Sequence, residues 1–135
     1  MITTAGPAAD RGTVLVVDDE AIVRMLVTET LEELGYTAIE AGDGLQGLRI
    51  LQSDASIDLL VTDVKLPGMN GRQLAEAARV VRPDLPVLFI TGYAQSVGGA
   101  QSVNLQPGMD LIGKPFSIDD LAAKIRQLVD GPQPG

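Results

Sequence analysis

The sequence predicts an α/β fold in which a five-stranded parallel sheet is covered by helices on both faces. Strand-like apolar runs alternate along the chain with segments of helical periodicity, and three of the runs (VLVV, IDLLV and VLFI) are almost continuously apolar. Such runs are typical of strands that are buried on both faces of a parallel sheet. The short links between alternating elements favour a doubly wound arrangement.

Five runs are predicted as strands, and breaker-rich ends bound a single domain. The strands are expected at residues 13–17, 36–41, 57–62, 86–90 and 109–112. The small and polar segments 1–11 and 131–135 predict flexible tails, so the domain is expected to span 12–130.

The first two predicted helices follow the first two strands. The first has an apolar stripe at a spacing of three to four residues, and Gly35 marks its end. For the second, Asp43 is a possible N-cap. The stripe residues are Val23, Val27, Leu31 and Leu34 in the first helix, and Leu45, Leu48 and Leu51 in the second.

Later in the chain, two more helices have start signals and one segment lacks them. Asn70 and Gln73 have the spacing of a capping box, and Ser117 can cap a final helix. Their stripes are Leu74, Ala78 and Val81, then Ile118, Leu121, Ile125 and Leu128. Between them, residues 92–108 hold four glycines and a proline. The fourth of five helices is therefore predicted to be short, frayed or partly loop.

Composition excludes several classes of function. The 135 residues include no cysteine and no histidine, which excludes thiol and Ser-His-Asp catalysis and most zinc sites. A bound metal would need oxygen ligands, as Mg²⁺, Ca²⁺ or Mn²⁺ do. The net charge of -8 argues against direct nucleic-acid binding. Without a signal peptide or a membrane-length apolar run, we expect a cytoplasmic protein with no membrane contact.

Polar residues that can do chemistry follow four of the five predicted strands. They are Asp18, Asp19, Asp63, Thr91 and Lys114. Because the carboxyl ends of parallel strands share one edge of the sheet, where ligands bind, these residues are expected to converge. Close carboxylates raise one another's pKa unless a cation offsets their repulsion, and Mg²⁺ prefers such ligands. With a lysine and a hydroxyl nearby, the set suits a phosphoryl group, which an aspartate can accept.

Each of these residues also has a structural explanation when it is taken alone. Asp19 could be a helix N-cap, Asp63 a cap or turn residue, and Thr91 part of a turn. Lys114 could be an exposed loop lysine. Their shared position at one end of the predicted sheet favours a site.

Four motifs together resemble the receiver domains of two-component response regulators. They are VLVVDDEA, LLVTDVKLPGMNG, VLFITGYA and GKPF, and they occur in the family's order over residues 12–130. The resemblance implies a flavodoxin-like sheet with strand order 2-1-3-4-5. It also implies that Asp63 is phosphorylated, and that Thr91 and Lys114 hold the phosphoryl group. The implied ligands of Mg²⁺ are Asp18, Asp19, Asp63 and the backbone carbonyl of Lys65.

The resemblance carries further expectations. The peptide bond between Lys114 and Pro115 should be cis, and Glu20 is placed at the start of the first helix rather than on the metal. Leu111 stands where many receivers have a switch aromatic. Lys65 and Tyr93 occupy positions that modulate hydrolysis of the phosphoryl group. Phosphorylation is hypothesised to order the weak segment 92–108.

The expected phosphodonor is a sensor histidine kinase or a histidine phosphotransfer protein. The output protein is unknown, and a homodimer through the face formed by residues 92–129 is an open prediction. A stand-alone receiver is expected, with the receiver of a hybrid kinase as the alternative.

Three other functions fit the sequence less well. A Mg²⁺-dependent phosphohydrolase would need a second acid where Lys65 stands. A flavin or nucleotide module lacks its glycine motifs, and the chain has only 3% aromatic residues. A degenerate receiver that only binds partners is disfavoured by the intact set of acids, Thr91 and Lys114.

Overall fold

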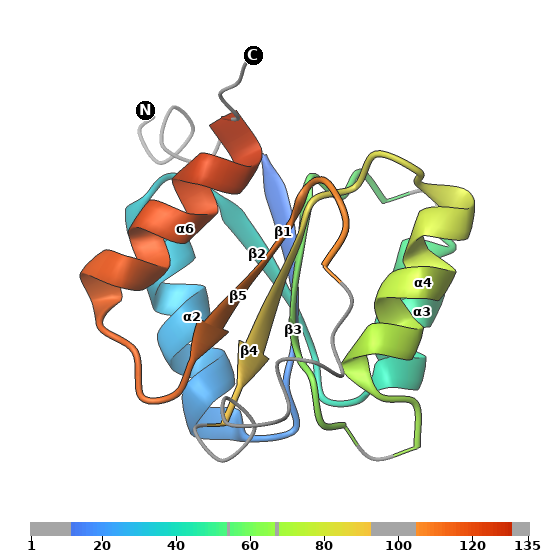
Figure 1. The fold of residues 1–135 in the computed structure, drawn as a ribbon, viewed down its shortest axis with the longest axis horizontal. Coiled ribbons are helices and arrows are strands. Elements are labelled where there is room, and N and C mark those ends of the chain that lie inside the picture. Colours follow the sequence, from blue (N-terminus) through green and yellow to red (C-terminus); the bar gives the residue numbers. More distant parts are fainter. Residues whose placement is uncertain (1–11, 54, 67, 93–104, 131–135) are drawn as a thin grey trace, which may run out of the picture.

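The computed structural model describes residues 12–53, 55–66, 68–92 and 105–130, and it confirms the predicted fold (Figure 1). Five parallel strands form one sheet in the order β2-β1-β3-β4-β5. The strands are β1 (Thr13–Val17), β2 (Thr37–Ala41), β3 (Leu59–Asp63), β4 (Val87–Thr91) and β5 (Met109–Gly113). Their bounds lie within two residues of those predicted from the sequence.

Two layers of helices cover the sheet. Helices α2 (Ala21–Glu33) and α6 (Ile118–Asp130) pack on one face, while α3 (Gly44–Leu51) and α4 (Gly71–Val81) pack on the other (Figure 1). Successive residues of β1 enter opposite cores: Val14 and Val16 pack under α2 and α6, and Leu15 and Val17 pack under α3 and α4. Because both faces are buried, the strand needs apolar residues at every position.

The predicted helix ends are confirmed. The Asp43 side chain accepts a hydrogen bond from the Gln46 backbone N–H at 2.8 Å. Asn70 and Gln73 form the predicted capping box, and the Ser117 hydroxyl oxygen accepts from the Asp120 N–H at 3.0 Å. After α2, Gly35 adopts a φ of 97°, the left-handed conformation that glycine accommodates best at a helix end.

Some predictions fall outside the described residues. Four of the five predicted helices are described, whereas the expected fourth one, in the 92–108 segment, falls mainly on residues 93–104, which lie outside the described part. The same holds for the predicted tails at 1–11 and 131–135. Within the described ranges, no helix has the length and apolar character needed to cross a membrane.

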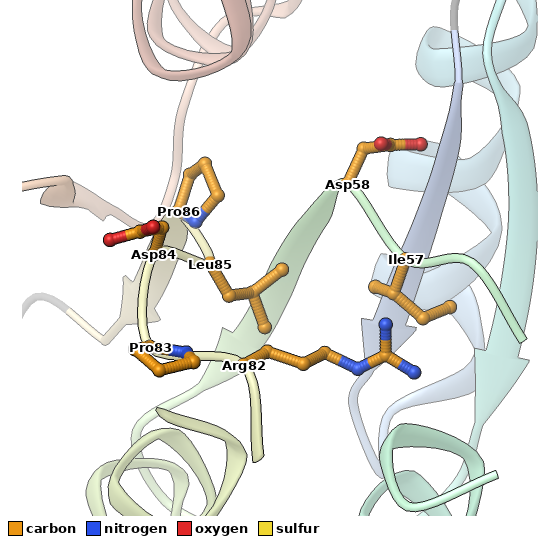
Figure 2. Close-up of a pocket in the computed structure, with 7 residues that line it drawn as sticks. All are labelled: Ile57, Asp58, Arg82, Pro83, Asp84, Leu85 and Pro86. Atoms are coloured by element: carbon orange, nitrogen blue, oxygen red, sulfur yellow. The ribbon is translucent and has the colours of Figure 1, made fainter. Parts of the chain in front are cut away.

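A cavity of about 380 Å³ opens at the amino-terminal edge of the sheet, beside the starts of β3 and β4 (Figure 2). The Arg82 guanidinium on its wall donates hydrogen bonds to the backbone carbonyl oxygens of Leu51, Ser53 and Ala55 at 3.1, 3.3 and 2.6 Å. Arg82 therefore ties the end of α4 to the segment after α3, which is a structural role. The polar residues predicted from the sequence lie at the opposite edge.

Candidate phosphoacceptor site

Backbone hydrogen bonds extend the parallel ladder past the strand ends and bring the predicted site residues to one edge. The N–H of Asp18 donates to the Ala41 carbonyl at 3.2 Å, and the N–H of Lys114 donates to the Thr91 carbonyl at 2.7 Å. Asp63 ends β3, between β1 and β4. This carboxyl edge lies at the bottom of Figure 1, where the arrowheads of β4 and β5 point.

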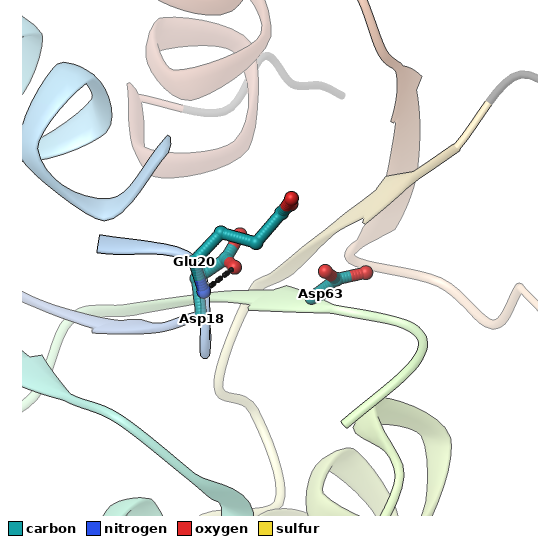
Figure 3. A group of neighbouring side chains, drawn as sticks. All are labelled: Asp18, Glu20 and Asp63. Atoms are coloured by element: carbon teal, nitrogen blue, oxygen red, sulfur yellow. Dashed lines mark hydrogen bonds between the residues drawn. The ribbon is translucent and has the colours of Figure 1, made fainter. Parts of the chain in front are cut away.

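Three carboxylates meet at this edge (Figure 3). Oxygen atoms of Asp18, Glu20 and Asp63 lie within 4.8 Å of one another. Asp18 is fully buried and Asp63 is 6% exposed. The Lys65 N–H donates to Asp63 Oδ1 at 3.2 Å, which fixes the direction of that carboxylate. The structure therefore brings together two of the three predicted acids.

The third predicted acid, Asp19, lies outside this group, and its side chain is exposed. Glu20 belongs to the group instead. The predicted position of Glu20 at the start of the first helix is correct, since Glu20 is the N-cap of α2. That its carboxylate would reach the other acids was not predicted, because this depends on the direction of a long side chain.

Lys114 lies between two of the acids. Its Nζ atom donates to Glu20 Oε1 at 2.6 Å and to Asp63 Oδ2 at 3.2 Å. Burial alone would lower the pKa of the Lys114 ammonium, but the hydrogen bond to Glu20 and the charge of Asp63 outweigh it and raise that pKa. The lysine therefore stays charged and can hold an anionic group beside Asp63.

Burial disfavours the charged form of the Asp18 side chain. Burial raises the pKa of its carboxyl to about 6; the Glu20 N–H bond, at 2.8 Å, lowers it, and the charge of Asp63 raises it. Its second oxygen, Oδ2, is buried without a hydrogen-bond partner. A buried carboxylate with an unused oxygen, facing a second carboxylate, is a ligand set that fits Mg²⁺.

Arg24 holds the acidic turn in place. Its Nη1 atom donates to the Asp18 carbonyl oxygen at 2.6 Å, and its Nε atom donates to Glu40 Oε1 at 3.0 Å. One side chain on α2 thus links the end of β1 to β2. No sequence pattern indicated this residue, since an arginine on the exposed side of a predicted helix carries no signal of such a contact.

The remaining predicted residues occupy the expected places. Thr91 ends β4, is buried, and donates its hydroxyl to the Gly92 carbonyl oxygen at 3.2 Å. The Lys114-Pro115 peptide bond is cis, as predicted. Leu111 is half-buried and packs against the core under α3 and α4, so a leucine fills the position of the usual aromatic. Tyr93 lies outside the described residues.

Gly71 lets the chain pass close behind Asp63. A Cβ atom at this position would clash with the Asp63 carbonyl oxygen and lie 2.9 Å from the carbonyl carbon, and the Gly71 N–H donates to the Val64 carbonyl at 2.8 Å. The Thr62 hydroxyl also donates to the Asp63 carbonyl oxygen, at 3.0 Å. The backbone of Asp63 is therefore packed without room for a side chain at position 71.

Gly71→Ala is expected to destabilise the domain by about 3 kcal/mol, because the added methyl must displace the Asp63 backbone. Urea unfolding of the two proteins measures the difference. Gly113→Ala is the matched control, since a Cβ there meets nothing within 4 Å, and a change below about 0.5 kcal/mol is expected. Equal stability of the Gly71 variant and the wild type would show that the close approach does not constrain the loop.

The fold and the site define a class of protein: a doubly wound α/β domain with buried acids and a lysine at the carboxyl edge of its sheet. Comparison with known proteins gives the family. The model for "Response regulator receiver domain" matches residues 14–126, and the chain belongs to this family. Domains of the family are signalling modules that accept a phosphoryl group and generally bind Mg²⁺ at an acidic cluster. They interact with histidine kinases or phosphotransfer proteins.

Individual relatives differ in length. The chain is 34% identical to "Sensor kinase CckA" of Brucella abortus (strain 2308) over 119 residues, which are 87% of this chain but 12% of that protein. It is 30% identical to "Sporulation initiation phosphotransferase F" of Bacillus subtilis (strain 168), covering 84% of this chain and 90% of that protein. A crystal structure of a response regulator receiver protein from Sinorhizobium medicae WSM419 superposes with a TM-score of 0.81 at 30% identity, covering 90% of this chain and 96% of that one.

Proposed function

We propose that this chain is a single-domain response regulator receiver that accepts a phosphoryl group on Asp63. The donor is the phosphohistidine of a histidine kinase or of a histidine phosphotransfer protein. Phosphorylation then switches protein–protein interactions within a phosphorelay. The observation that carries this proposal is the position of the Asp63 carboxylate, which accepts a hydrogen bond from the Lys114 ammonium and lies in one group with Asp18, a buried acid with one oxygen that lacks a partner.

In the transfer step, an oxygen of the Asp63 carboxylate attacks the phosphorus atom. The bond from phosphorus to the donor's imidazole nitrogen breaks as the bond to Asp63 forms, and the nitrogen keeps the electron pair. The Lys65 N–H orients the carboxylate. Lys114 is placed to neutralise charge on the phosphoryl oxygens, and the Thr91 hydroxyl, at the end of the neighbouring strand, is proposed to donate to one of them.

The proposed Mg²⁺ ligands are Asp18 and Asp63, to which the family resemblance adds Asp19 and the Lys65 backbone carbonyl. When bound, the cation would offset the charge of the acids and of the incoming phosphoryl group. Asp18 contributes the buried oxygen that lacks a partner. In this proposal Asp19 contributes from the exposed side of the site.

The wild-type protein is expected to gain the mass of one phosphoryl group when it is incubated with Mg²⁺ and a small acyl phosphate. Peptide mapping by mass spectrometry should place the group on Asp63. Chelation of Mg²⁺ before the donor is added should prevent the reaction, because the acids then repel the anionic donor. No mass gain in Mg²⁺, or a gain that persists at full rate in chelator, would contradict the proposal.

A second candidate is the C-terminal receiver of a hybrid histidine kinase. It is favoured by the 34% identity to a sensor kinase of which the chain spans 12%, whereas the match along 90% of a phosphotransferase favours the single-domain form. An immunoblot with an antibody raised against this chain distinguishes the two candidates. The native protein would have the mass of this chain if it is a single-domain receiver, and the mass of a much larger kinase if it is part of a hybrid.

Partners and location complete the proposal. A purified kinase or phosphotransfer protein that carries a labelled phosphoryl group should transfer it to Asp63 on mixing. Unchanged label on every donor tested would count against a relay role.

In this role the domain would act in the cytoplasm, and its output partner would be a protein. Dimerisation through the 92–129 face stays a prediction, since residues 93–104 lie outside the described part.

A further inference from the structure

Glu20 occupies the N-cap position of α2 but does not cap the helix. Aspartate, asparagine, serine and threonine are preferred there, because their short side chains reach the free N–H groups of the first turn. The Glu20 side chain makes no such hydrogen bond. Its carboxylate instead binds Lys114, which lies 94 residues further along the chain. A residue that makes a long-range contact in place of the capping hydrogen bond that its position favours is a candidate for a functional role.

Glu20 and Asp63 share a single ammonium group. Lys114 Nζ lies 2.6 Å from Glu20 and 3.2 Å from Asp63. The Glu20 side chain is 59% exposed, whereas that of Asp63 is 9% exposed. The shorter of the two contacts of the ammonium is therefore with the more exposed acid. A phosphoryl group on Asp63 would add strongly charged oxygen acceptors that need the same cation.

We propose that Glu20 is a positioning residue that holds Lys114 in the unphosphorylated domain and competes with the phosphoryl group for its ammonium. This inference rests on the proposed function, because it requires phosphorylation of Asp63. When the phosphoryl group arrives, the ammonium leaves Glu20 and pairs with the phosphoryl oxygens. Removing the contact from Glu20 therefore favours the phosphorylated form.

Two substitutions separate the contact from the charge. Glu20→Gln removes the charge. Glu20→Asp keeps the charge, but the shorter side chain can cap α2 and no longer reaches Lys114. Both variants are expected to raise the rate constant for phosphorylation by a small acyl phosphate in Mg²⁺ about fivefold, which is the size expected for one exposed charge pair. Time courses by mass spectrometry measure this rate, and the affinity for beryllofluoride, a phosphoryl mimic, should rise by the same factor.

Asp110→Asn is the matched control. Asp110 binds Lys124 at 3.1 Å at the other end of β5, so this variant loses one acid and one lysine pair without touching the site, and its rate should equal that of the wild type. Thermal unfolding should show Glu20→Asp to be at least as stable as the wild type, since aspartate is a better cap. A partly unfolded variant would be phosphorylated more slowly, so a higher phosphorylation rate cannot be explained by structural damage.

The outcomes are distinct. A Glu20→Asp variant that behaves like the wild type while Glu20→Gln is faster would show that charge alone acts, and would overturn the positioning role. Equal rates in all four proteins, or slower phosphorylation in both Glu20 variants, would overturn it too. A wild type that takes up no phosphoryl group would overturn the proposed function, and this inference with it.

Discussion

Asp63→Asn is expected to abolish phosphorylation by acyl phosphates while the fold is retained. Asparagine has nearly the same shape, and its amide oxygen can still accept the Lys65 N–H, but an amide is not a nucleophile toward phosphorus. The measurement is the intact mass after incubation with Mg²⁺ and donor. The variant should show no added phosphoryl group under conditions that modify the wild type completely.

The matched control for this experiment is Asp58→Asn. Asp58 precedes the same strand at the opposite edge of the sheet, where its carboxylate accepts the Thr13 N–H at 2.8 Å, and an amide oxygen can accept the same bond. This variant should be phosphorylated at the wild-type rate. Phosphorylation that persists in the Asp63 variant would move the acceptor to another residue and contradict the proposed chemistry.

Asp18→Asn is expected to stabilise the metal-free domain by about 3 kcal/mol near pH 7. Burial raises the pKa of Asp18 from 3.8 to about 6, and each tenfold change in proton affinity corresponds to about 1.4 kcal/mol of folding free energy. The amide avoids the cost of a buried charge, keeps the bond from the Glu20 N–H, and can donate toward the Asp63 carboxylate, since these side chains lie close together. Urea unfolding in chelator measures the gain.

The gain should depend on pH with a definite sign. Between about pH 4 and 6 the folded wild type binds more protons than its unfolded chain, so its stability falls as pH rises. The difference between the variant and the wild type should therefore grow from near zero at about pH 4 to its full value above about pH 6. Asp84→Asn, at an exposed acid of the opposite edge, should show no such growth.

The effect of Mg²⁺ on stability tests the role of Asp18 independently. Binding to the folded state raises the free energy of unfolding by mass action, and the wild type should gain stability in Mg²⁺ near pH 7. The gain should fade below about pH 6, where a proton occupies Asp18. Asp18→Asn should gain little at any pH. An equal response of both proteins to Mg²⁺ would remove Asp18 from the metal site.

Most of the fold could be predicted because each strand and helix leaves a local signal. The apolar run of β1 reflects its burial on both faces, and the capping residues Asp43, Asn70 and Ser117 mark helix starts that the structure confirms. The carboxyl ends of β3 and β4 were predicted one residue short, because the last residue of each strand is polar. Asp63 and Thr91 both belong to their strands, whereas the apolar pattern predicts them just beyond.

The sequence by itself determined which residues could meet, because parallel strands place all their carboxyl ends at one edge. That rule was enough to bring Asp18, Asp63 and Lys114 together across the chain. Only the tertiary structure decided how they meet: Glu20 rather than Asp19 joins the acids, Arg24 holds the acidic turn, and Gly71 passes behind Asp63. These contacts depend on side-chain rotamers and on the close approach of distant backbone segments, neither of which leaves a periodic pattern in the sequence.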